Sequence, residues 1–267
     1  MKTIIVGTDF TPSSLNACKY AALLAQKLNC KLTIFNLFEA PLIHSNIGLY
    51  GIDYASAKSD SQQKIHKLQK TLSKLFPDVK LDMFVKNGSL ENELEIFSAK
   101  HHVEAAVMGL ESKNRISKFI WGSHGVDVAG RIKAPVIIVP QTYKKHKLSK
   151  VLLAVDNNEK LYKASLKVFE KFIKDAEVEL QLLHVRTEDE LFKPVSSELK
   201  INGKMITIEG LKATDIESGV KRFTKKSSID LVSIISKKHS VLYDLFVESN
   251  TKKIAFAAKV PVMAIHE

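Results

Sequence analysis

The sequence predicts an α/β fold made of two tandem open-sheet domains, each a five-stranded, mostly parallel sheet with helices on both faces. Internal repetition is the first observation behind this prediction. The segment KTIIVGTDF (2–10) recurs as SKVLLAVDN (149–157), and RIKAPVIIVP (131–140) recurs as FAAKVPVMAIHE (256–267). The second observation is that continuous apolar strand patterns alternate with helical patterns, which is typical of a parallel sheet covered on both faces.

The repeats divide the chain of 267 residues into two copies of one unit. We expect a first domain at 1–140, a basic linker at 141–150 and a degenerate second domain at 151–267. The second copy is the shorter one, because a polar stretch at 186–203 replaces a long helix of the first copy.

Helix and strand signals follow one another regularly in the first copy. Thr11-Pro12-Ser13-Ser14 opens its first helix, with hydroxyl side chains suited to capping and a proline in the first turn. Apolar periodicity places strands at 2–6, 31–38, 79–85, 105–108 and 136–139, and helices at 11–28, 58–75, 90–100 and 126–132.

The second copy repeats this order with losses. Strands are expected at 151–155, 178–185, 205–208, 231–235 and 262–265, and helices at 161–174 and 216–225. The last strands, 136–139 and 262–265, are expected to pair within the chain, which would protect two sheet edges.

Composition excludes several classes of protein. No apolar run approaches the length of a membrane span, and the start of the chain lacks the apolar core of a signal peptide. Cys18 and Cys30 give no disulfide framework, so we expect a reducing, cytoplasmic setting. The net charge is +11, yet only four of the 40 basic residues are arginines, and base recognition relies on arginine. A solvated basic surface is therefore favoured over a nucleic-acid site.

The segment VMGLESKNRISKFIWGSHGVDVAG (107–130) has the composition of a phosphate-binding loop. Gly109 and Gly122 allow close backbone approach or a positive φ, and Ser123 or His124 can cap the helix that follows. Open parallel sheets bind ligands at the carboxyl ends of their strands. An ordinary strand–loop–helix connection is an equally simple interpretation of the same residues.

At this loop the sequence resembles the universal stress protein family. The family pattern is glycine, two residues, glycine, nine residues, glycine, serine, and here it spans Gly109 to Ser123 with Ser112 in place of the second glycine. VGTDFTPSS (6–14), the Val-Met-Gly strand end and the closing APVIIVP support the resemblance, which covers both copies. It implies an adenine nucleotide α-hydrolase-like, Rossmann-like fold.

The resemblance also implies a set of nucleotide contacts. Asp9 would contact the ribose and the backbone around Leu37 the adenine. Gly109 would lie under the ribose and phosphates, and the phosphates would accept backbone amides from Gly122, Ser123 and His124. A simpler role for Asp9 is an acid interacting with the dipole of the following helix.

Ser112 departs from the family pattern. Its side chain costs on the order of 1 kcal/mol if glycine is needed there for a positive φ, although its hydroxyl can donate to a phosphate. The second copy departs further, with Ile235 for Gly109, Lys238 for Ser112 and Glu248 for Gly122. A carboxylate beside a phosphate is unfavourable, so a nucleotide is expected only in the first copy.

No metal-ligand spacing and no nucleophile motif is present, which favours a binding protein over an enzyme, with any ATP hydrolysis slow and incidental. The expected function is a stress-response regulator that binds ATP or a related adenine nucleotide, with Mg²⁺ held only through the phosphates. The alternative is a nucleotide-free dimerisation or scaffold module. Intramolecular pairing of the domains leaves room for a homodimer. The apolar loop 41–54 either packs on its own domain or serves as a lid or partner surface.

Overall fold

The computed structural model describes residues 2–38, 42–44, 50–52, 54–88, 90–111, 134–155, 163–187, 197–236 and 259–266. The elements of the first half are β1 (Thr3–Gly7), α1 (Pro12–Lys27), β2 (Lys31–Phe38), β3 (Leu42–His44), β4 (Tyr50–Ile52), α2 (Tyr54–Leu75), β5 (Leu81–Asn87), α3 (Leu90–Lys100), β6 (Val103–Leu110) and β7 (Val136–Pro140). Those of the second half are β8 (Lys150–Ala154), α5 (Lys163–Ala176), β9 (Glu179–Arg186), β10 (Glu198–Ile201), β11 (Lys204–Lys212), α6 (Ile216–Ser227), β12 (Leu231–Ser236) and β13 (Val262–His266).

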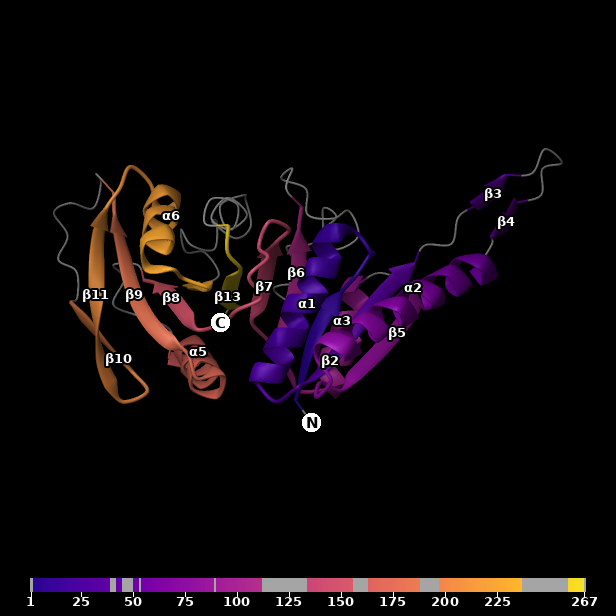
Figure 1. Cartoon of the computed structure of the whole chain (residues 1–267), viewed down its shortest axis with the longest axis horizontal. Helices are drawn as coiled ribbons and strands as arrows, with labels where there is room; N and C mark the ends of the chain where they lie inside the picture. Colours follow the sequence, from indigo (N-terminus) through magenta and orange to yellow (C-terminus); the bar gives the residue numbers. More distant parts are fainter. Residues whose placement is uncertain are drawn as a thin grey trace.

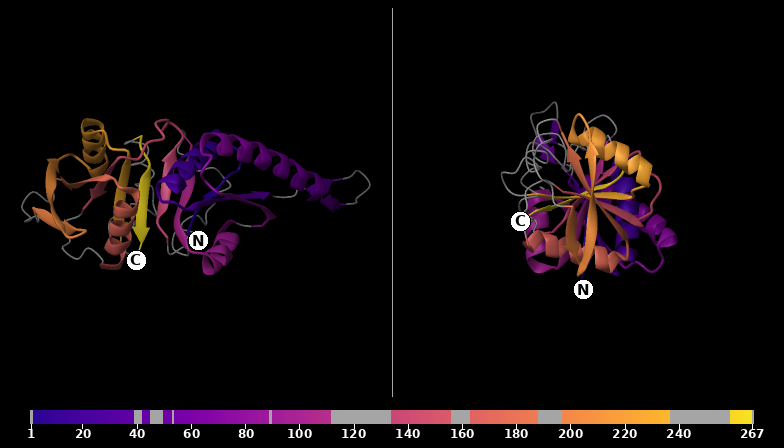
Figure 2. Two further views of the ribbon diagram at one scale, coloured as in Figure 1. Left: turned by 60° about the horizontal axis from the view of Figure 1, so that its bottom comes forward. Right: turned by 90° about the vertical axis from the view of Figure 1, so that its left-hand side faces the viewer.

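A single sheet runs through both halves, and the predicted α/β class is confirmed. The sheet has eleven strands in the order β10-β11-β9-β8-β12-β13-β7-β6-β1-β2-β5 (Figure 1). Helices lie on both of its sides, and its strands fan out when the molecule is viewed along the sheet (Figure 2). This fan is the accumulated twist that L-amino acids impose on open sheets.

The first half contributes the five parallel strands β5, β2, β1, β6 and β7, as its strand patterns predict. Helix α1 covers their centre, in contact with β6, β1 and β7. Its Thr11 N-cap accepts a hydrogen bond from the Ser14 amide, and Pro12 occupies the first turn. The buried face of α1 is rich in small side chains, including Ala17, Ala21 and Ala25, so the helix can lie close to the sheet.

The second half contributes six strands, so the expectation of a five-stranded sheet is wrong for this copy. The additional strand is β10, which pairs antiparallel with β11 at the edge of the sheet. Asn202 and Gly203 both have positive φ, 48° and 79°, as a two-residue hairpin turn requires. The polar stretch that replaces a helix in this copy therefore ends in a hairpin.

The two halves meet where β13 pairs antiparallel with β7, with Val262 opposite Ile138 and Ala264 opposite Val136. All five residues of β7 are buried. Because the pairing is antiparallel, the strands of the two halves run in opposite directions. The carboxyl ends of the first-half strands therefore lie at the same end of the sheet as the amino ends of the second-half strands.

Helix α2 extends beyond the edge strand β5, and the β3–β4 hairpin stands at its far end (Figure 1). The hairpin lies away from the carboxyl end of β1, and the expectation that loop 41–54 forms a lid or partner surface stays a prediction. The helix expected at 126–132 lies outside the described residues. None of the described helices combines the length and apolar character needed to cross a bilayer.

Candidate functional site at the carboxyl edge of the first half

The carboxyl ends of β1, β2 and β6 lie side by side at one edge of the sheet. Strand β1 lies between the other two, with Gly7 opposite Phe35 and Val6 opposite Val107. Three of the predicted site residues, Asp9, Leu37 and Gly109, are therefore brought to this edge. The remaining four, Ser112, Gly122, Ser123 and His124, lie outside the described residues.

Asp9 is part of the tight turn between β1 and α1. Its Oδ1 accepts hydrogen bonds from the Thr11 backbone amide at 3.1 Å and from the Thr11 hydroxyl at 2.7 Å. Phe10 between them has a φ of +61°, which is strained for a residue with a side chain. The carboxylate thus lies just before the start of α1, where the helix dipole stabilises a negative charge.

Two further polar residues of this edge escaped the sequence prediction. The buried Asn36 donates from Nδ2 to the Thr8 carbonyl at 2.8 Å, which ties β2 to the turn after β1. Its Oδ1 is buried and has no hydrogen-bond partner among the described residues. The Thr8 hydroxyl lies 3.1 Å from that of Ser14, at the first turn of α1. A lone asparagine inside an apolar strand pattern was the available signal.

Gly109 lies where the first turn of α1 crosses β6. A Cβ on Gly109 would lie 2.5 Å from the Ser13 carbonyl oxygen and 2.8 Å from the Ser14 amide nitrogen. The φ angle of Gly109 is not positive, so the backbone conformation does not require glycine here. The glycine instead allows α1 to lie close to β6. Packing of the helix therefore accounts for this glycine without any ligand.

The second half repeats the sheet register of the first. Val6 pairs with Val107 and Gly109 with Val139, while Leu153 pairs with Ser233 and Ile235 with Ile265. Ile235, which is buried, therefore takes the place of Gly109. A buried, branched side chain therefore stands at the strand position where the first half has glycine.

The thiols and the metal-binding groups of the described residues offer no further chemistry. Burial is the main reason that the pKa of Cys18 is raised to about 12 and that of Cys30 to about 11, so both thiols stay protonated at neutral pH. No group of three or more potential metal ligands occurs in the part of the chain that the structure describes.

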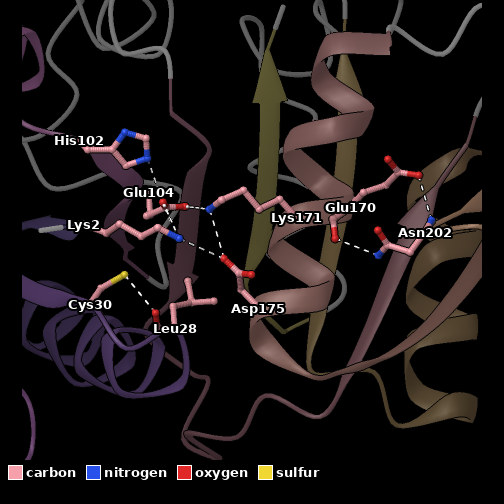
Figure 3. Close-up of polar contacts among 9 residues, drawn as sticks. All are labelled: Lys2, Leu28, Cys30, His102, Glu104, Glu170, Lys171, Asp175 and Asn202. Carbon is pink, nitrogen blue, oxygen red and sulfur yellow. Dashed lines mark hydrogen bonds and ion pairs between the residues drawn. The ribbon is translucent and has the colours of Figure 1, made fainter.

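An ion cluster joins the amino-terminal ends of β1 and β6 in the first half to α5 in the second half (Figure 3). The Lys2 ammonium lies 3.4 Å from Glu104 and 3.3 Å from Asp175, and the Lys171 ammonium lies 2.7 Å from Glu104 and 3.2 Å from Asp175. Lys2 and Glu104 belong to the first half, whereas Lys171 and Asp175 lie on α5 of the second. We call these four residues the seam cluster.

Charge in the seam cluster shifts the pKa of both carboxyl groups. Burial alone raises the pKa of Glu104, but the hydrogen bond and charge of Lys171, together with Lys2, outweigh burial and lower it. The pKa of Asp175 is lowered in the same way, with Lys171 and Lys2 outweighing desolvation. Both groups therefore hold their negative charge more firmly in the folded chain than in the unfolded one.

Comparison with known proteins identifies relatives of the chain. Residues 1–140 match the profile of the universal stress protein family. A universal stress protein from Archaeoglobus fulgidus aligns at 16% identity and a TM-score of 0.64, covering 99% of this chain and 98% of that one. A putative universal stress protein from Pseudomonas aeruginosa aligns at 12% identity and a TM-score of 0.55, covering 99% and 92%. No curated protein matches the chain.

Proposed function

The chain belongs to the universal stress protein family, and from this premise we propose that it is a stress-response regulator that binds an adenine nucleotide at the carboxyl edge of its first half. The arrangement around Asp9 carries this proposal. A carboxylate, the start of a 16-residue helix and a buried amide oxygen of Asn36 without a described partner lie together where three parallel strands end. Such an edge is where open α/β sheets bind nucleotides.

Each described residue has a part in this binding. The Asp9 carboxylate accepts from ribose hydroxyls, and the end of β2 at Leu37 supplies backbone groups and an apolar wall for the base. The positive end of the α1 dipole favours a negatively charged group nearby. The phosphates are held by Gly122, Ser123 and His124, with Ser112 donating from its hydroxyl, and Mg²⁺ is held only through the phosphate oxygens.

The protein acts by binding, in a reducing cytoplasmic setting. The Asp9 carboxylate already accepts two hydrogen bonds from Thr11. These bonds fix the carboxylate in the turn, and they do not orient it as a general base. ATP turnover is then slow and incidental to the regulatory role.

The alternative function, a nucleotide-free scaffold, draws on one observation. The Gly109 position is explained by the close approach of Ser13, so this glycine does not require a nucleotide. In that function the continuous sheet and the seam cluster would present a rigid two-domain body to a partner.

Isothermal titration calorimetry with ATP separates the two functions. Asp9→Asn keeps a carbonyl oxygen for the Thr11 hydrogen bonds but removes the charge, and we expect it to weaken ATP binding about tenfold or more, as for loss of a charged hydrogen bond. The matched control is Asp215→Asn, because Asp215 is the N-cap of α6 and accepts from the Ser218 amide at 2.7 Å. No heat from the wild type at millimolar ATP would support the scaffold.

A further inference from the structure

A cavity of about 460 Å³ lies between the segment that joins the two halves and the C-terminal end of α6. Three stretches that are far apart in the sequence form its walls: the segment after β7, the last two turns of α6 with the residues that follow, and the residues just before β13. The lining residues are Thr142, Tyr143, Lys144, Lys145, Lys221, Thr224, Lys225, Ser228, Ile229, Lys259 and Val260. We call this cavity the seam pocket.

Positive charge is the main chemical feature of the seam pocket. Five of its lining residues are lysines, and none of the described residues that line it is acidic. Lysines in the last turn of a helix have an ordinary explanation, since they stabilise the negative end of the helix dipole. That explanation covers Lys225 on α6, but it does not cover Lys144, Lys145 or Lys259, which come from two other segments. Like charges gathered around one cavity repel each other, and a bound anion relieves this repulsion.

The floor of the seam pocket is apolar. Tyr143, Ile229 and Val260 are all buried, so the lysines stand at the rim of a formed hollow and not on a flat surface. Hydroxyl groups of Thr142 and Ser228 add hydrogen-bond donors on two of the walls. Thr224 lies beside them, and its buried hydroxyl has no hydrogen-bond partner in the described part of the chain. An unmet buried hydroxyl is uncommon and points to a missing partner.

We propose that the seam pocket binds a small anion that carries several phosphate groups. Lysine ammonium groups act as compact point charges on flexible stems, which suits phosphate oxygens better than a planar, bidentate partner. The volume lies within the usual range of small-molecule sites, about 300–1,000 Å³. A single phosphate would leave most of the five lysines without a counter-charge, whereas two or more phosphates balance them.

The proposal is independent of the nucleotide edge described above. None of the described residues that line the seam pocket belongs to the set predicted to contact the nucleotide. An anion in the pocket would contact Lys144 and Lys145 of the joining segment together with Lys221 and Lys225 of α6. Its binding would therefore tie the joining segment to the second half.

Calorimetry of the full chain with inorganic tripolyphosphate tests the proposal. We expect one site per chain in the wild type. Lys221→Gln/Lys225→Gln should weaken binding about tenfold or more, since each substitution removes a charge-assisted contact. The matched control is Lys204→Gln/Lys226→Gln, which removes the same charge from exposed residues of the same half that do not line the pocket. It should change the affinity by less than about twofold.

Four outcomes would overturn the proposal. The first is the absence of heat at millimolar tripolyphosphate, and the second is an equal loss in both double variants, which would indicate a diffuse positive field. The third is a single-stranded oligonucleotide that binds more tightly than tripolyphosphate through Lys221 and Lys225, which would indicate a nucleic-acid surface. The fourth is loss of tripolyphosphate binding in Asp9→Asn, which would place the anion at the nucleotide edge. If Asp9→Asn keeps tripolyphosphate binding while the wild type binds no ATP, the proposed function fails and the seam pocket stands.

Discussion

Gly109 is the residue at which β6 and the first turn of α1 come closest. A methyl group there would lie 2.5 Å from a backbone oxygen, and backbone cannot move aside as a flexible side chain can. We expect Gly109→Ala to lower the free energy of unfolding by about 1–3 kcal/mol, the usual cost of overpacking. Urea denaturation followed by circular dichroism measures the change.

The matched control for Gly109 is Gly210→Ala in β11. A Cβ at Gly210 would lie 3.4 Å from the end of the Arg186 side chain, which is an ordinary contact. Because glycine is intrinsically unfavourable in a strand, the free energy of unfolding of this variant should lie within about 1 kcal/mol of the wild-type value. Equal losses in the two variants would contradict the packing explanation of Gly109.

Two substitutions in the predicted phosphate-binding loop, chosen from the family pattern, test whether the loop binds the phosphates. Gly122→Glu copies Glu248 of the second half and should abolish ATP binding, because it adds a side chain and a negative charge near the phosphates. Ser112→Gly restores the family residue and should leave the ATP affinity unchanged or raise it. Equilibrium dialysis with labelled ATP measures both, and undiminished binding by Gly122→Glu would place the phosphates elsewhere.

Part of the candidate site could be predicted residue by residue. Asp9 and Gly109 follow apolar strands directly, so the rule for carboxyl ends of parallel strands placed them at one edge. The reason for Gly109 could not be predicted, because it depends on where α1 crosses β6 in three dimensions. Asn36 was missed for the same reason, since its partner is the Thr8 backbone carbonyl in the turn after β1.

At the scale of elements, continuous apolar runs identified the strands of the main sheet well. Strand β2 has the predicted bounds, and β12 differs by one residue, because both are buried on the two faces and bounded by polar residues. Strand β10 was missed because it is only four residues long (ELKI) and follows a polar stretch, so its alternation of polar and apolar residues is too short to stand out. Its turn at Asn202-Gly203 was the usable signal.

The seam cluster links α5 of one half to the start of β1 and β6 of the other. We expect a double-mutant cycle of Glu104→Gln and Lys171→Gln to give a coupling energy of about 0.5–1 kcal/mol at low salt. The Lys86–Glu93 pair lies wholly within the first half and provides the control cycle. Chemical denaturation in low and high salt measures both couplings, and a seam coupling of zero at low salt would show that the cluster is solvated.

The pH dependence of the seam cluster has a definite sign. The folded pKa values of Glu104 and Asp175 are lowered below their ordinary values of 4.5 and 3.8. The cluster's stabilisation is thus fully present above pH 4.5 and is lost as the pH falls through the lowered folded values. The coupling energy should therefore be smaller at pH 3 than at pH 7.

At the scale of the whole molecule, the antiparallel pairing of β7 with β13 determines how the two halves face each other. Among the described residues, it leaves β10 and β5 as the edge strands of the sheet. Separation of the halves would expose β7, which is apolar throughout, and β13, which is apolar except for His266. It also brings the carboxyl edge of the first half and the amino edge of the second to one side. The candidate nucleotide edge and the seam pocket therefore lie at the same end of the strands of the sheet.

The two halves share one strand register but not one set of site residues, so we expect a single nucleotide per chain. Ile235 occupies the position of Gly109, and Glu248 aligns with Gly122. Native mass spectrometry with ATP should show one bound nucleotide in the wild type and a much smaller bound fraction in Asp9→Asn at the same ATP concentration. Asp156 aligns with Asp9 in the second half, so Asp156→Asn should still bind one. Two equivalent nucleotides in the wild type, one of them lost in each variant, would mean that the second half tolerates a carboxylate beside the phosphates.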